Sequence, residues 1–198
     1  MKKALGLTLV IIAAVVILAA MTFGGIYNHL VTTDEAVKSA WGQVQNVYQR
    51  RLDLVPNLVE TVKGYAAHEQ ETFQGVVDAR AKISQLNLSP EIINDPELFA
   101  KFQQAQGNLS STLSRLLAVV ENYPDLKASA NFLALQTQLE GTENRIAVER
   151  HRYNETARAF NTLRRVFPNV VVANVMGFKE KAYFQADEGA AKAPAVKF

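Results

Sequence analysis

The chain opens with a run of apolar residues that no charge interrupts. From Ala4 to Phe23 the residues are uncharged and mostly apolar. As a helix that rises about 1.5 Å per residue, this run spans roughly 30 Å, which is the thickness of a bilayer core. A cleaved signal peptide is the alternative, but its apolar core is usually about 7 to 15 residues long, shorter than Leu5–Met21. We therefore predict a transmembrane anchor over residues 4–25.

The charges that flank the run predict its orientation. Lys2 and Lys3 precede it, and the first charged residues after it are Asp34 and Glu35. Because positively charged flanks stay on the cytoplasmic side, residues 1–3 are predicted to be cytoplasmic and the domain after the anchor extracytoplasmic. Small residues near the end of the run leave cleavage by a peptidase open. No cysteine follows them, which excludes a bacterial lipoprotein.

After the anchor, apolar residues recur at helical spacing in segments that prolines separate. Thr33, followed by two acidic residues, fits the N-cap of a helix that continues the anchor. A proline is tolerated in the first turn of a helix and not in its interior, so a second helix is predicted to begin at Pro56. The predicted buried positions are Val37, Trp41, Val44 and Tyr48 in the first helix, and Leu58, Val62, Tyr65, Phe73, Val76 and Ile83 in the second.

Two further helices follow a loop that the prolines and asparagines of residues 87–96 predict. The third helix is predicted over about Glu97–Asn122, and the next break is at Asn122–Asp125. The fourth and longest helix keeps a seven-residue apolar repeat and ends at Pro168. The predicted buried rows are Phe102, Leu109, Leu113, Leu116 and Val120 in the third helix, and Phe132, Leu139, Ile146, Tyr153, Phe160 and Phe167 in the fourth.

Four amphipathic helices with one apolar stripe each bury those stripes against one another, which predicts an all-α fold. We expect an antiparallel four-helix bundle over residues 26–185, and a long interrupted coiled coil is the alternative. Val170–Val172 is the one β-rich stretch. Residues 186–198, rich in Ala, Lys and Gly, predict a disordered tail.

Composition excludes several classes of function. The formal net charge is +2, too small to predict nucleic-acid binding. The chain has no cysteine, which removes disulfides, thiol catalysis and Cys-ligated metals. With 48% hydrophobic and 20% charged residues, the part beyond the anchor has the composition of one folded domain.

No pattern in the chain matches a catalytic or metal site. A di-metal carboxylate bundle needs paired Glu-x-x-His motifs, yet the residues three positions before His68 and His151 are Tyr65 and Val148. His68 beside Glu69 is a weak hint of a phosphotransfer histidine, because such a residue is usually a solvated surface group. We predict no catalytic activity, no cofactor and no metal.

A polar run on the fourth helix is the strongest candidate site. Glu143 lies four residues after Leu139 of the apolar row, and Arg150 lies four residues after Ile146. An aliphatic residue normally occupies this position in a helix seam. A buried charge is costly unless it is paired, so we expect opposite charges from other helices, such as Arg80, Arg115 or Glu121.

Asn144, Arg145 and Tyr153 complete this set of candidate contacts. Such a network either fixes helix register and partner choice, or it binds a polar ligand. Gly141 weakens the helix by about 1 kcal/mol relative to Ala and permits close helix approach, so it is compatible with both interpretations.

Several sequence motifs together resemble the LemA family over residues 27–183. The most specific is the run Leu139–Ala147, with Arg150 and Tyr153–Asn154 after it; the others are Arg50–Val59, Val62–Ala66 with His68–Glu69, Asn122–Pro124, Leu126–Ala128 and Asn131–Phe132. The resemblance implies a bacterial single-pass membrane protein with a helical extracytoplasmic domain and no established activity. One branch of the family is linked to the formation of magnetosome membranes.

These observations predict a scaffold or adaptor in the bacterial inner membrane. We expect it to self-associate or to serve a membrane-protein partner, and to take part in membrane organisation. The alternative is a binding module for an envelope peptide, lipid headgroup or glycan, on the polar face of the fourth helix. A pocket lined by Glu143, Asn144 and Arg145 would favour that alternative.

The segment after Pro168 is predicted to return near the membrane, because the chain reverses at each break between helices. It is unusually apolar at Val170–Val172, Val175 and Met176, and basic and aromatic residues follow. It is interpreted either as a membrane contact over residues 166–184 or as a strand-like strap over the bundle core.

Overall fold

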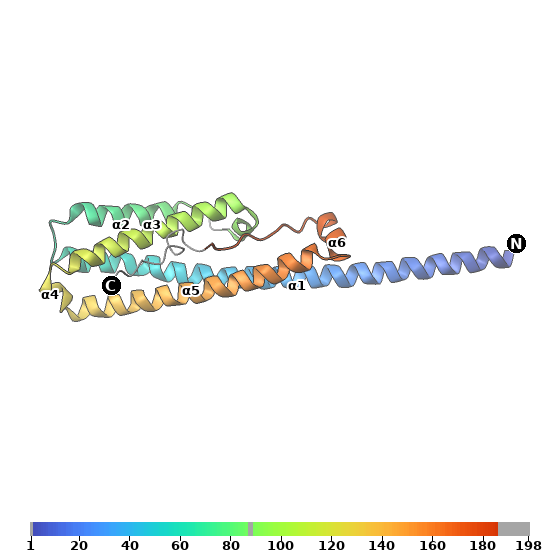
Figure 1. Cartoon of the computed structure of the whole chain (residues 1–198), viewed down its shortest axis with the longest axis horizontal. Coiled ribbons are helices and arrows are strands. Elements are labelled where there is room, and N and C mark those ends of the chain that lie inside the picture. The colour runs from blue at the N-terminus through green and yellow to red at the C-terminus, as the bar shows by residue number, and fades with distance from the viewer. Residues whose placement is uncertain (1, 87–88, 186–198) are drawn as a thin grey trace, which may run out of the picture.

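Helices account for all the regular secondary structure in residues 2–86 and 89–185, the part of the chain that the computed structural model describes (Figure 1). In chain order they are α1 (Lys2–Lys63), α2 (Gln70–Ser84), the 3₁₀ turn η1 (Pro90–Asn94), α3 (Pro96–Val120), α4 (Pro124–Lys127), α5 (Ala130–Arg165) and α6 (Asn169–Val175). The second half of α1 lies beside α2 and α5, α2 lies beside α3, and the helices of each of these pairs run antiparallel (Figure 1). The prediction of an all-α four-helix bundle is confirmed.

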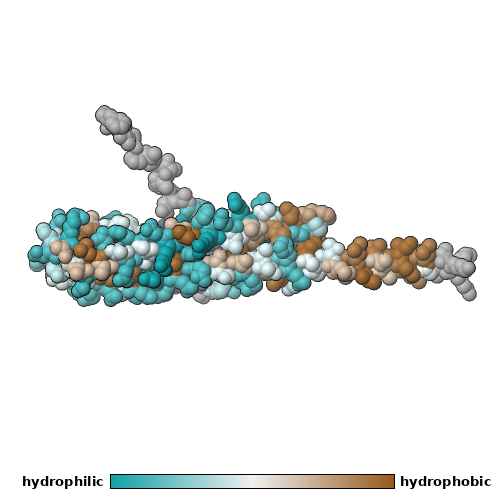
Figure 2. Space-filling model, turned by 90° about the horizontal axis from the view of Figure 1, so that it is seen from below, coloured by the Kyte–Doolittle hydropathy of each residue, from teal (hydrophilic) through white to brown (hydrophobic). Residues whose placement is uncertain are grey.

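The first part of α1 projects from this bundle as a single helix. Its most apolar 18-residue window has a mean hydropathy of 2.7, and none of that window is buried. Figure 2 shows it as a brown apolar rod beyond the bundle. By length and composition, this helix is able to cross a membrane.

Pro56 does not begin a helix, contrary to the prediction; it lies inside α1. A proline lacks the N–H group that would bond to the carbonyl of Leu52, four residues earlier. Arg80 of α2 supplies the missing donor, because its Nε donates to the Leu52 carbonyl at 3.1 Å. Thr33 is not an N-cap either. Its hydroxyl donates to the carbonyl of His29 within the continuous helix at 2.9 Å.

The second predicted helix is therefore two segments, the end of α1 and α2, which a turn at residues 64–69 separates. The Ala66 N–H donates back to the Val62 carbonyl and closes α1. Tyr65, predicted to be buried, lies in this turn and is 50% exposed. The other predicted core positions of this stretch are buried.

The buried face of α1 alternates four-residue and three-residue steps without interruption through Pro56. Its members are Leu30, Asp34, Val37, Trp41, Val44, Tyr48, Arg51, Val55, Leu58 and Val62. Eight of these ten residues are apolar or aromatic, and the exceptions are Asp34 and Arg51. The predicted rows of α3 and α5 are also buried, except that Phe167 lies beyond α5 and is 82% exposed.

The bundle consists of two helix pairs. α1 packs along α5 and α2 packs along α3, whereas in the described chain α3 and α5 lack a comparable backbone contact. Aromatic side chains fill the space between the pairs. The Trp41 ring lies 5.4 Å from the ring of Phe102 and 5.7 Å from those of Phe99 and Tyr153.

The end of the described chain is a short helix followed by an extended segment. Val170–Val172, the β-rich stretch, is helical in α6. Residues 177–185, which we call the strap, then run back over the bundle between α3 and α5, and they bury Lys181 and Phe184 (Figure 1). The predicted strap is present over this part of the segment. The predicted disordered tail, residues 186–198, lies outside the described residues.

Candidate functional site

Three side-chain amides hold the strap by its backbone. Asn161 accepts from the N–H of Lys181 and donates to its carbonyl, both at 2.9 Å. Asn154 does the same for Phe184 at 2.9 Å. Gln103 of α3 donates to the Gln185 carbonyl at 2.9 Å and accepts from its N–H at 3.3 Å.

The spacing of these amides matches an extended chain. Asn161 and Asn154 are seven residues apart, which is about 10 Å along a helix. Lys181 and Phe184, which they hold, are three residues apart, which is about 10 Å along an extended chain. The bundle therefore binds an extended peptide through backbone groups, antiparallel to α5.

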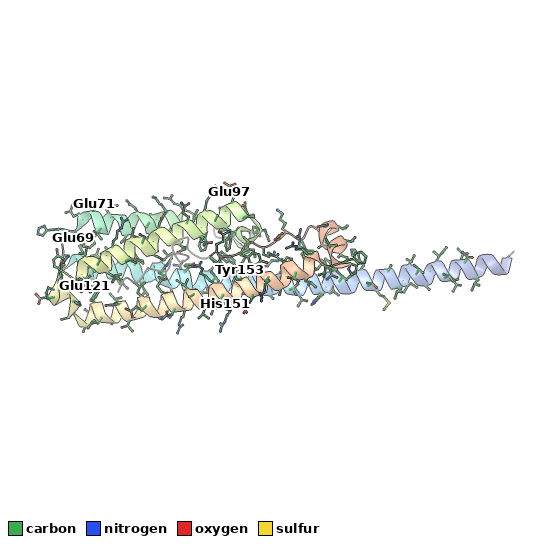
Figure 3. The ribbon with its side chains drawn as sticks, viewed as in Figure 1. Glu69, Glu71, Glu97, Glu121, His151 and Tyr153 are labelled. Atoms are coloured by element: carbon green, nitrogen blue, oxygen red, sulfur yellow. The ribbon has the colours of Figure 1, made fainter. Side chains whose placement is uncertain are left out.

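Arg150 and Tyr153, two of the predicted site residues, contact the strap. The Tyr153 hydroxyl donates to the Ala182 carbonyl at 2.8 Å, and burial raises the pKa of that hydroxyl well above its ordinary value. Arg150 donates to the Gln185 carbonyl at 2.9 Å, and its guanidinium lies 4.8 Å above the Phe184 ring. Figure 3 shows Tyr153 within the bundle, whereas His151 lies on the outside.

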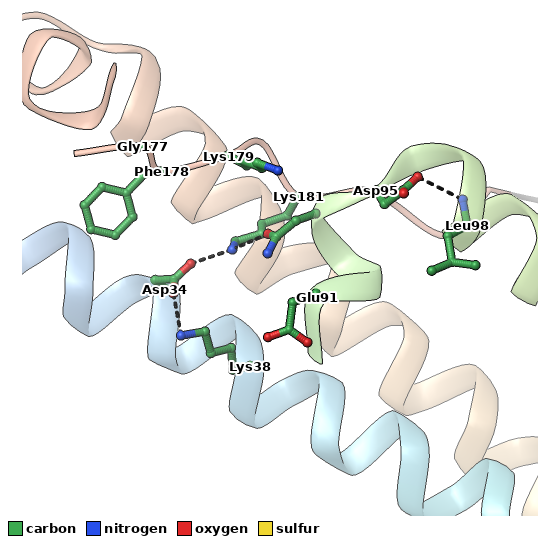
Figure 4. Close-up of a pocket in the computed structure, with 10 residues that line it drawn as sticks. Asp34, Lys38, Glu91, Asp95, Leu98, Gly177, Phe178, Lys179 and Lys181 are labelled. Carbon is green, nitrogen blue, oxygen red and sulfur yellow. Dashed lines mark hydrogen bonds and ion pairs between the residues drawn. The ribbon is translucent and has the colours of Figure 1, made fainter. Parts of the chain in front are cut away.

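A buried ion pair joins the strap to α1. Lys181 lies 2.5 Å from the carboxylate of Asp34 and donates to Asn94 of η1 at 2.7 Å, at the wall of an open hollow (Figure 4). Lys38 also approaches Asp34, at 2.9 Å. Burial alone would raise the pKa of Asp34, but the hydrogen bonds and charges of the two lysines outweigh it and hold the pKa below its ordinary value.

Glu143, whose side chain is 41% exposed, pairs with the buried Arg51, a partner that the sequence did not predict. The Arg51 side chain, 2% exposed, donates to Glu143 at 3.0 Å and to the Ser110 hydroxyl at 2.9 Å. Its second terminal nitrogen donates to the side-chain oxygen of Gln106. The guanidinium also lies 5.1 Å above the ring of Tyr48. The network ties α1, α3 and α5 together at one level.

The expected partners Arg80, Arg115 and Glu121 do not meet Glu143 or Arg150. Arg80 bonds to the Leu52 carbonyl, and Glu121 pairs with Lys127, six residues later in the chain. Arg115 is exposed and lines a hollow between α2 and α3. Close helix approach at Gly141 is also absent, because a Cβ built on this exposed residue would meet nothing within 4 Å.

An open furrow lies next to the ion pair of Arg51 and Glu143. It has a volume of about 430 Å³ and lies between α3 and α5; its lining is Ser110, Leu113, Ser114, Leu117, Leu139, Glu140, Glu143 and Asn144. Two predicted site residues, Glu143 and Asn144, thus share one groove. Arg145 is exposed and is not part of the lining. Among the described residues that line it, two are acidic and none is basic.

The sequence did contain a signal for the residues that the prediction missed. Asp34 and Arg51 interrupt the apolar face of α1 at its four-and-three spacing, but a helix break placed at Pro56 hides that spacing. Gln103, Asn154 and Asn161 carry no such signal, because surface amides are common on helices.

The structure is a helical bundle joined to an exposed apolar helix that is long enough to cross a membrane. These two features define the class as a membrane-associated protein. Residues 40–198 match the model of the LemA family. The chain belongs to the LemA family.

The chain is similar in sequence to magnetosome proteins. The chain is 29% identical over 175 residues to magnetosome protein MamQ 1 of Paramagnetospirillum magneticum, an alignment that covers 80% of this chain and 64% of that protein. It is 28% identical over 174 residues to magnetosome protein MamQ of Magnetospirillum gryphiswaldense, with the same coverage. It is 27% identical over 161 residues to protein LemA of Metamycoplasma hominis, covering 81% of this chain and 69% of that one. The chain thus spans about two thirds of the length of these relatives.

Proposed function

We propose that this protein is a self-associating, non-catalytic scaffold of the bacterial envelope, with an N-terminal membrane anchor and an extracytoplasmic bundle. The continuity of α1 supports this most directly. One helix of 62 residues includes both the apolar segment and one wall of the bundle, so the bundle cannot swivel freely on its anchor. A fixed orientation suits a protein that positions other molecules at a membrane.

The similarity to magnetosome proteins is compatible with a role in membrane organisation. Their names concern those proteins, and the same role for this chain is part of our proposal. The cation-flanked apolar segment supports a cytoplasmic N-terminus. Exposed apolar residues on the outer face of α5, such as Leu133 and Val148, each 49% exposed, offer a surface for contact between copies.

Single-cysteine variants test the proposal without background, because the chain has no native cysteine. In intact cells, Val148→Cys should react with a membrane-impermeant maleimide. In the same membranes, Leu133→Cys and Val148→Cys should form intermolecular cross-links with a short bismaleimide, whereas Val77→Cys, an equally exposed valine on α2, should not. Monomers at all three positions would show that the protein does not self-associate.

The furrow between α3 and α5 favours a second candidate function, the binding of an extended peptide. The strap shows how this bundle holds such a chain, through amides that bond to the backbone. Glu140 and Glu143 favour a basic peptide, and the leucines beneath them favour apolar side chains.

A fluorescent peptide of alternating valine and lysine is a suitable probe for the full-length protein in nanodiscs. Ser114→Trp fills the furrow, and Ser111→Trp changes the same residue type outside it. We expect Ser114→Trp to weaken binding at least tenfold and Ser111→Trp to leave it unchanged. Equal affinity of both variants, or equal binding of a valine–glutamate peptide, would count against this candidate.

A further inference from the structure

An apolar surface lies at the end of the bundle from which the anchor part of α1 emerges. It consists of Phe167, Val171, Val175 and Met176, which are 82%, 54%, 72% and 46% exposed. Val171 and Val175 are four residues apart and share one side of α6, and Phe167 lies in the turn that precedes α6. We call this the α6 surface. Figure 2 shows apolar residues at this end of the bundle, next to the brown rod of α1.

The opposite side of α6 fixes its position beside α1. Val172 and Ala173 are 4% and 0% exposed, and they belong to the same buried cluster as Phe160 of α5. Phe178, directly after α6, lies with its ring 6.1 Å from that of Tyr27 on α1 and 6.2 Å from that of Phe160. These contacts hold α6 against the bundle, and Phe178 after it lies at the level of Tyr27, less than one turn beyond the predicted end of the anchor at residue 25.

This position decides what neighbour the surface meets. A bilayer that encloses α1 up to residue 25 places its headgroup boundary at the level of residues 26 and 27, where Phe178, three residues after the end of α6, packs on Tyr27. Four exposed apolar side chains close to that level suit contact with lipid better than contact with water. Arg165 and Lys179, both exposed, flank the surface in the chain and suit anionic headgroups.

We propose that the α6 surface is a second membrane contact, which inserts into the headgroup boundary of the leaflet that α1 leaves. This inference rests on the anchor of the proposed function. It assigns to the residues after Pro168 two distinct roles: α6 contacts lipid, and the strap closes the bundle. A second contact beside the anchor resists tilting of the bundle, which a single spanning helix does not.

Nitroxide labels on single-cysteine variants of the full-length protein, in vesicles of phosphatidylcholine and phosphatidylglycerol, test this contact. Accessibility to oxygen, which concentrates in lipid, is compared with accessibility to a water-soluble nickel chelate. Val175→Cys is the test position, Val15→Cys in the anchor is the lipid control, and Val77→Cys on α2, outside the proposed contact between copies, is the water control. All three replace an exposed valine.

The α6 proposal expects Val175 to favour oxygen over nickel, as Val15 does, at a shallower depth, and Val77 to favour nickel. A label at Val175 that is as accessible to nickel as one at Val77, while Val15 lies in lipid, would overturn the α6 contact and leave the anchor intact. A water-exposed label at Val15 would overturn the anchor and with it both proposals. Phe178 is unsuitable as a probe site, because it is half-buried between Tyr27 and Phe160.

Discussion

Arg80 of α2 donates a hydrogen bond to the carbonyl of Leu52 in α1, which is the carbonyl that Pro56 leaves without its helical partner. This bond explains how a 62-residue helix passes through a proline without ending. Arg80 thus replaces the helical donor that Pro56, 24 positions earlier in the chain, lacks.

The first prediction concerns this coupling. Arg80→Ala leaves the Leu52 carbonyl without its side-chain donor, which we expect to lower the free energy of unfolding by about 1 to 2 kcal/mol. In a Pro56→Ala background the helix supplies its own N–H, so the same change should cost less than half as much. Denaturant unfolding of the four variants measures the difference. Equal costs in both backgrounds would mean that Arg80 acts through packing alone.

The second prediction concerns the ion pair between Arg51 and Glu143. Glu143→Gln removes the charge opposite a buried guanidinium, and we expect a loss of about 1 to 3 kcal/mol. Glu140→Gln, at an exposed position one turn away, should cost less than 0.5 kcal/mol, as surface changes usually do. Adding Arg51→Met to Glu143→Gln should recover part of the loss. No difference between Glu143 and Glu140 would show that Ser110 and Gln106 suffice for Arg51.

The third prediction concerns acid stability, through Asp34. Its pKa is lowered in the folded protein from an ordinary value of 3.8, so its contribution to stability is present above that value and is lost as the pH falls through the folded pKa. We expect the free energy of unfolding to fall more steeply below about pH 4 in the native protein than in Asp34→Asn. Asp78→Asn, on an exposed face of α2, is the control. Parallel acid profiles of all three proteins would contradict the role of Asp34.

The fourth prediction separates two glycines. Gly141 lies in the interior of α5 with nothing within 4 Å of a built Cβ, so Gly141→Ala should stabilise the protein by about 0.5 to 1 kcal/mol. Gly177 begins the strap with φ of +74°, where a Cβ is strained, so Gly177→Ala should destabilise by about 1 to 2 kcal/mol. Thermal unfolding measures both changes. A destabilised Gly141→Ala would indicate a partner that contacts this face of α5.

The sequence predicted the bundle because helix periodicity is a local property. The rows of α3 and α5 follow from spacing alone, and the buried residues Leu109, Leu116 and Ile146 confirm it. The helix start at Pro56 was wrong because the competing factor, the Arg80 side chain, comes from another helix. Local rules for proline do not include a donor supplied across the bundle.

The candidate site was less predictable, because pairing between helices depends on their relative register. Glu143 was recognised as a charge in a seam, yet its partner Arg51 comes from α1 and not from the helices that were expected. The strap is held by side-chain amides that each make two hydrogen bonds to the backbone of one residue, as Asn154 does to Phe184. These require the three-dimensional path of a segment that has no periodicity of its own.

The unbroken course of α1 also sets a distance. From Gly25 to Lys63 the helix rises by about 57 Å at 1.5 Å per residue. With the anchor in the bilayer, the α1–α2 turn, where Tyr65 and His68 are exposed, stands that far from the lipid surface. A partner that binds this turn therefore binds at a fixed distance from the membrane, because a continuous helix and not a flexible linker sets that distance.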